Sequence, residues 1–227
     1  PLIIALFCAV FASPAFAEDD CTRSASVGVG TGYVYSSTGG FGTEKPVTQN
    51  DITIHCGNWS SNLWMSAELT GHRNDEIDAT VSYSNTLWDS GLDFSITAAY
   101  YLIGFEGPGA GLGSAKNDFG FAGIEVGRPF HIGTATVRPL VEFASYIPLD
   151  GSRALKFVRT GADMKIPLSD RWSVSLSPGV SFDLDGGKRF DGWAAVTYTF
   201  DNEWAISAGI KKVGSDQAGL LTLSFPL

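Results

Sequence analysis

Apolar and polar residues alternate with a period of two along most of the chain. The alternation is clearest in residues 51–56, 63–69, 77–83, 92–98 and 173–183. Successive side chains of a β-strand point to opposite faces, so this pattern predicts strands with one apolar face and one polar face. The polar face consists mostly of Ser, Thr, Gly and Asp, which suits a wet and crowded interior better than a Lys- and Glu-rich soluble surface.

The connections between the predicted strands alternate in length. Counting about twelve strands from Ser24, the odd connections are long or glycine-rich: 36–47, 71–76, 105–118, 148–153, 185–191 and 214–218. The even connections are mostly tighter: 57–61, 86–91, 129–133, 168–171 and 201–203. Long outer loops and short periplasmic turns are typical of a transmembrane antiparallel up-and-down β-barrel. We therefore expect an all-β barrel of about twelve strands with both termini in the periplasm.

An apolar segment from Leu2 to Val10 is followed by Ala15-Phe16-Ala17 and then by Glu18. This order predicts a signal peptide over residues 1–17, cleaved before Glu18, and a barrel over residues 18–227 in a bacterial outer membrane. A membrane-anchoring helix is the alternative, but it needs about 20 apolar residues.

After cleavage two cysteines remain, Cys21 and Cys56. Cys21 precedes the first predicted strand and Cys56 closes the second, so both lie at the periplasmic rim of adjacent strands. In an oxidising compartment this placement predicts a disulfide.

Aromatic residues gather near the two predicted ends of the strands. Trp59, Trp88, Trp172 and Trp204 fall by the short turns, and Tyr35, Tyr100, Tyr101, Tyr146, Phe190 and Trp193 fall near the long connections. Two such groups predict aromatic girdles at the two lipid boundaries. The last strand alternates through Leu221, Leu223, Phe225 and Leu227, as in the segment that barrel-assembly machinery recognises.

Three segments resemble the TorF-type porin family of proteobacterial outer-membrane proteins: residues 25–35, 58–69 and 76–102. The matching positions are Glu76, Asp78, Tyr83, Asp93, Tyr100 and Tyr101. The chain departs from the family at Tyr35-Ser36-Ser37, where an Arg-Gly pair is usual, and at Leu102-Ile103-Gly104, where Tyr-Pro-Gly is common. The resemblance implies a porin.

The chemistry-bearing residues do not favour an enzyme. His55, His72 and His131 are scattered, and none has a Ser two residues later. An omptin-like protease would have only His72 with Asp75 and Glu76 as candidates. The glycine-rich segments 28–32 and 107–116 lack the pattern of a nucleotide site, so we expect no cofactor. Because the histidines are scattered, we expect no metal. The net charge of −9 argues against nucleic acid as a partner.

Charged residues on the polar parity are expected to line the lumen. The acids are Asp51, Glu68, Asp78, Asp93, Glu125, Glu142, Asp163 and Asp183, and the bases are Arg138, Arg159 and Lys165. The excess of acids predicts a monomeric channel for ions or small polar solutes with a weak preference for cations. Two alternatives stay open: a closed barrel in which these charges pair and whose loops serve adhesion or structure, and a soluble lipocalin-like barrel with an apolar interior.

Overall fold

The structure is a computed structural model that describes residues 21–34, 41–70, 76–87, 90–103, 118–149 and 151–227. Twelve long strands form its wall: β1 (Cys21–Gly30), β4 (Val47–Cys56), β5 (Trp59–Glu68), β6 (Glu76–Leu87), β7 (Leu92–Ile103), β8 (Phe119–Gly127), β10 (Ala135–Pro148), β11 (Leu155–Pro167), β12 (Trp172–Asp183), β13 (Lys188–Thr199), β14 (Ala205–Val213) and β15 (Asp216–Pro226). No helix in the described part of the chain is long and apolar enough to cross a membrane.

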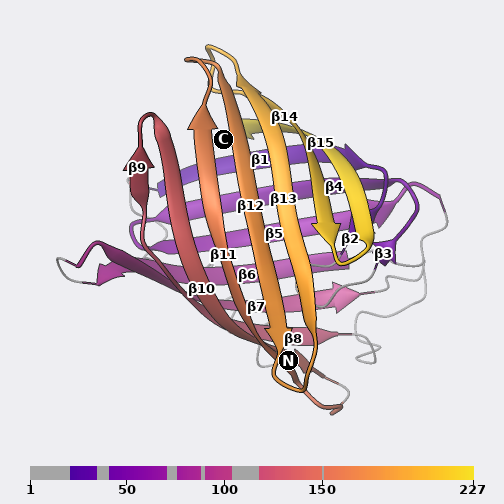
Figure 1. The fold of residues 1–227 in the computed structure, drawn as a ribbon. Coiled ribbons are helices and arrows are strands. Elements are labelled where there is room, and N and C mark those ends of the chain that lie inside the picture. Colours follow the sequence, from indigo (N-terminus) through magenta and orange to yellow (C-terminus); the bar gives the residue numbers. More distant parts are fainter. Residues whose placement is uncertain (1–20, 35–40, 71–75, 88–89, 104–117, 150) are drawn as a thin grey trace.

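These twelve strands close into a ring of antiparallel pairs (Figure 1). Each strand pairs with its neighbours in the chain, and β1 pairs with β15, so that the sheet has no free edge among these strands. In Figure 1, β10 to β14 form the near wall and cross the strands of the far wall, as the strand tilt of a closed barrel requires. The predicted up-and-down barrel of about twelve strands is confirmed.

Three short strands supplement the wall. β9 (Phe130–Ile132) extends β10 beyond its pairing with β8, through Phe130 opposite Val137. β2 (Tyr33–Val34) and β3 (Phe41–Thr43) form a separate two-stranded sheet within the first long connection. The connection predicted as a simple turn at 129–133 therefore contains a strand of its own.

The apolar face of the wall points outward. Val27, Ile96, Phe143 and Leu221 are 45%, 51%, 56% and 46% exposed, although each lies within a paired strand. Such a band of exposed apolar side chains is stable in lipid and is unfavourable in water. Most large aliphatic residues therefore face outward and do not fill an interior, as they would in a lipocalin-like soluble barrel.

Two of the predicted connections prove shorter than expected. β13 begins at Lys188 and β15 at Asp216, so the predicted connections 185–191 and 214–218 are partly strand. The turn between β14 and β15 is tight because Gly214 adopts a φ of 61°, a conformation that favours glycine. We call the end of the barrel with the connections after β1, β5, β7, β10, β12 and β14 the long-connection end, and the opposite end the short-turn end.

Cys21 and Cys56 lie at the short-turn end. Cys21 belongs to β1 rather than preceding it, and it is paired directly with Cys56 of β4. The two Cα atoms are 4.4 Å apart and the sulfur atoms are bonded. At the same end, the backbone N–H of Leu227 donates to the carbonyl of Arg23, so the chain's last residue closes against its first strand.

We predict that non-reducing peptide mapping of the folded protein finds Cys21 and Cys56 in one linked pair. The Cys21→Ser, Cys56→Ser double variant should lower the free energy of unfolding by about 2–4 kcal/mol, because the cross-link restricts the unfolded chain. Wild-type protein unfolded with reductant is the control and should match the double variant. Two free thiols in the folded wild-type protein would contradict the bridge.

Candidate functional site

The polar side chains at alternate positions of each long strand line the inner wall of the barrel. Asp78, Glu142 and Arg159 line a cavity in the lumen. The other eight residues expected there share these inward faces by register or by parity: Asp51, Glu68, Asp93, Glu125, Arg138, Asp163, Lys165 and Asp183. Asp51, for example, lies opposite the cavity residue Trp64, and Glu125 lies opposite Glu142.

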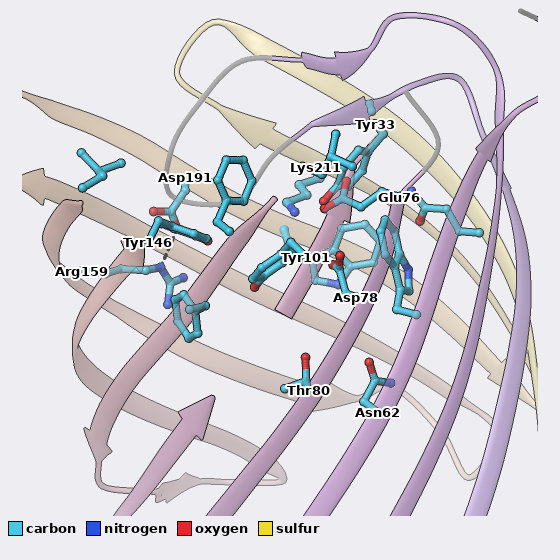
Figure 2. Close-up of a pocket in the computed structure, with 18 of the residues that line it drawn as sticks. Tyr33, Asn62, Glu76, Asp78, Thr80, Tyr101, Tyr146, Arg159, Asp191 and Lys211 are labelled. Carbon is cyan, nitrogen blue, oxygen red and sulfur yellow. Dashed lines mark hydrogen bonds and ion pairs between the residues drawn. The ribbon is translucent and has the colours of Figure 1, made fainter. Parts of the chain in front are cut away.

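The cavity has a volume of about 1110 Å³. Its lining extends from Tyr33 and Pro148 near the long-connection end to Asn62, Thr80 and Ser177. Figure 2 shows side chains from opposite parts of the wall converging on it, with Tyr101 between the Arg159 side and the Asp78 side. Only three of the eleven predicted lumen residues line this space. The others lie on the inner face at other heights or are engaged in local bonds.

Arg138 holds a cluster of carboxylates near the short-turn end. Its guanidinium donates to Asp93 at 2.7 Å and to Glu125 at 2.6 Å, and it lies 3.5 Å from Asp163. Asp93 belongs to β7, two strands away from β10, so the arginine reaches across β8. Gly127 of β8 makes room for it, since a Cβ at that position would lie 2.7 Å from the guanidinium carbon.

A second ion pair lies on the cavity wall. Arg159 Nε donates to Asp191 Oδ1 at 2.7 Å, and Ser181 Oγ donates to Asp191 Oδ2 at 2.7 Å. Arg159 and Asp191 come from β11 and β13, on either side of β12. Gly179 of β12 leaves the space they occupy, because a Cβ there would be within 2.9 Å of both side chains.

A third group of charges combines Glu76 and Asp78 of β6 with Lys211 of β14. Figure 2 shows Lys211 reaching toward Glu76 and Tyr33. The Lys211 ammonium lies 5.8 Å from the centre of the Tyr33 ring, within the range of a cation–π contact. Glu76 is 1% exposed, and both of its carboxylate oxygens and Oδ1 of Asp78 are buried without a hydrogen-bond partner among the described residues.

Aromatic side chains surround the cavity, which corrects part of the girdle prediction. Trp59, Trp172 and Trp204 lie on the outer surface at the short-turn end, 48%, 47% and 42% exposed, as expected. Tyr101, Tyr146 and Trp193 instead line the lumen, because their parity is that of the inward face. Trp88 and Tyr35 lie outside the described residues.

The inward aromatics form two groups. Tyr146 is the centre of one, with ring centroids 5.9 Å from Tyr101, 5.1 Å from Phe121 and 5.7 Å from Phe157. In the other, Tyr33 from the first long connection contacts Trp64 of β5, with centroids 5.1 Å apart. Part of the first connection therefore narrows the lumen. The glycine-rich segment 107–116 lies outside the described residues.

Sequence reasoning missed several cavity residues. Glu76 was placed at the end of a loop, Asp191 in a connection, and Lys211, Tyr33 and Trp64 were not singled out. Parity identifies Trp64 and Lys211, since they alternate with Leu63 and Ile210. His55 lies on the inward parity of β4 and His131 contacts Thr136, whereas His72 is outside the described residues. In the described part of the chain no three His, Cys, Asp or Glu side chains are grouped to hold a metal.

Comparison with known proteins finds solved structures with a similar fold. No protein-family model matches the chain, and no curated protein matches it in sequence. Among solved structures, the NanC porin superposes with a TM-score of 0.62 at 8% identity, covering 89% of this chain and 100% of that one. The KdgM porin in complex with disordered oligogalacturonate superposes with a TM-score of 0.60 at 7% identity, covering 90% and 98%.

This chain has the fold of the outer-membrane porins. The likeness spans nine-tenths of the chain and nearly all of each porin, so it applies to the whole barrel and not to a shared fragment. The porin fold and the apolar outward face agree with the location in a bacterial outer membrane that the sequence predicts.

We predict that Arg138→Gln lowers the free energy of unfolding by about 1–3 kcal/mol, because three carboxylates then face one another without their cation. Urea unfolding of the protein in lipid vesicles measures this. Arg171→Gln is the matched control, since Arg171 pairs with Asp201 on the exposed surface of a turn and such pairs contribute little. Equal stability of the two variants would show that the Arg138 cluster is not a structural element.

Proposed function

We propose that this protein is a porin-like channel of the outer membrane that passes ions and small polar solutes with a weak preference for cations. The observation that carries the proposal is the charge of the cavity wall. Five acids line it, Glu76, Asp78, Asp118, Glu142 and Asp191, against two bases, Arg159 and Lys211. In a narrow passage with walls of low dielectric constant, such an excess concentrates cations and repels anions.

The porins with the same fold support the class of activity but not the ligand. One of them was solved with oligogalacturonate, which is an anionic sugar chain. An acidic cavity disfavours an anion of that kind. We therefore propose that this chain, like those porins, passes small solutes. We do not propose that it passes the same solute.

Several features of the sequence complete this proposal. Residues 1–17 act as the signal peptide, and residues 18–227 insert as a monomer with both termini in the periplasm. Barrel-assembly machinery recognises the last strand, and outer-membrane lipid surrounds the barrel. Membership of the TorF-type porin family is part of the same proposal. The protein needs no cofactor and is not an enzyme.

A closed barrel is the second candidate, and two contacts favour it. The Arg138 cluster joins β7, β8, β10 and β11 across the inner face near the short-turn end, and the Tyr33–Trp64 contact narrows the lumen nearer the other end. In that case the segments 36–47 and 105–118, of which residues 36–40 and 105–117 lie outside the described residues, carry an adhesive or structural role.

Planar-bilayer recording of the purified protein tests the channel. We expect single-channel steps and, in a KCl gradient, a reversal potential whose sign corresponds to K⁺ passing more readily than Cl⁻. Heat-unfolded protein at the same concentration is the control for leakage. The absence of conductance by the folded protein would overturn the channel in favour of the closed barrel, and a preference for Cl⁻ would overturn the role given to the acidic wall.

A further inference from the structure

The register of the sheet places a carboxylate between two aromatic rings inside the cavity. Asp78 of β6 lies directly opposite Trp64 of β5 on one side and opposite Tyr101 of β7 on the other. Residues opposite each other in antiparallel strands have Cβ atoms about 4.5–5.5 Å apart, so the three side chains stand next to one another on the inward face. All three line the cavity.

Glu76 adds a second carboxylate to this place. It lies two residues before Asp78 on the same strand and therefore on the same face, and it also lines the cavity. Glu76 is almost wholly buried, and neither of its oxygens has a hydrogen-bond partner among the described residues. Burial without a donor is costly for the charged form of a carboxylate, so a cation that reaches this part of the wall would stabilise that charge.

The cavity already contains one ammonium group, which is part of the protein. Lys211 reaches from β14 toward Glu76 (Figure 2) and lies over the face of Tyr33. The Tyr33 ring in turn contacts Trp64. An alkyl ammonium between aromatic faces and carboxylates is the chemistry of known aromatic cages for organic cations. Five acids line the whole cavity wall against two bases, Arg159 and Lys211, so its carboxylates outnumber the cationic groups of the protein.

We propose that the lumen holds a binding site for organic ammonium ions, formed by Asp78 and Glu76 with the rings of Trp64 and Tyr101. The carboxylates attract the charge, and the rings bind the alkyl groups and the face of the cation. A cavity of about 1110 Å³ admits a solute of this class together with water. This inference refines the proposed function, because it names the kind of solute that the passage would select.

Choline and its neutral isostere 3,3-dimethylbutan-1-ol test the site on the purified full-length barrel in detergent. Tryptophan fluorescence and titration calorimetry measure binding without requiring any conductance. We expect choline to bind at least about tenfold more tightly than the isostere, because the charge contributes a difference of that order at a paired site. Equal binding of the two, or no choline binding, would overturn the proposal.

Three variants locate the site. Asp78→Asn should weaken choline binding about tenfold or more, since it removes the charge between the rings and keeps the shape. Glu125→Gln is the matched control: it removes a carboxylate from the inner wall within the Arg138 cluster and outside the cavity, and it should leave choline binding unchanged. Lys211→Met removes the competing ammonium and should tighten choline binding several-fold.

Heat modifiability on gels establishes that each variant is folded before binding is compared. If Asp78→Asn and Glu125→Gln affect choline binding equally, the effect is one of overall lumen charge and the site is wrong. If choline binds as expected but bilayers show no conductance, the binding site is supported and the proposed channel is wrong. If the protein conducts ions but does not bind choline, the proposed channel is supported and the proposed binding site is wrong.

Discussion

The structure depends on the closure of the backbone hydrogen-bond network. In a hydrocarbon environment no water is present to satisfy N–H and C=O groups, so a sheet that crosses a membrane must pair both edges of every strand. Here the pairing of β1 with β15 closes the ring. Once it is closed, each residue of a strand has one choice of face, and a shift of one residue would move a whole strand's apolar side chains into the lumen.

Closure of the barrel also limits the volume that an inward side chain can occupy. Glycine residues on the inner wall provide part of the space that the large inward side chains need. Trp193 on the inner wall covers Gly209 of the adjacent strand so closely that any Cβ there would displace the indole. Gly127 under Arg138 and Gly179 under the Arg159–Asp191 pair have the same relation. The largest and most highly charged inward groups thus lie flat over positions that have no side chain, which keeps the centre of the lumen free for the cavity.

Parity in the sequence was sufficient to predict the barrel and the inward face, because a strand's period of two is a local property. The aromatic girdle at the long-connection end was predicted from position along the chain alone, and Tyr101, Tyr146 and Trp193 show that parity decides instead. Strand ends in glycine-rich hairpins were placed too far apart, since Gly186 and Gly214 allow turns tighter than their surroundings suggest. The contact of Arg138 with Asp93 depends on the stagger between strands, and the contact of Tyr33 with Lys211 depends on the path of a connection. Neither property can be read from the pattern of a single sequence.

The lumen charges divide into two sets with different consequences. Near the short-turn end, the carboxylates that surround Arg138 already form ion pairs with it. A cation in the lumen would therefore gain little direct interaction energy from them. In the cavity, Glu76 and Asp78 retain oxygens that accept no hydrogen bond from the described residues, so a cation entering the proposed site would gain interactions that this part of the protein has not already made. An interaction discriminates among solutes only where the protein has not already made it, so the proposed selectivity rests on the cavity and not on the Arg138 cluster. The same division allows one barrel with an acidic interior to contain ion pairs on its inner wall and, at the proposed site, carboxylate oxygens that accept no hydrogen bond from the described residues.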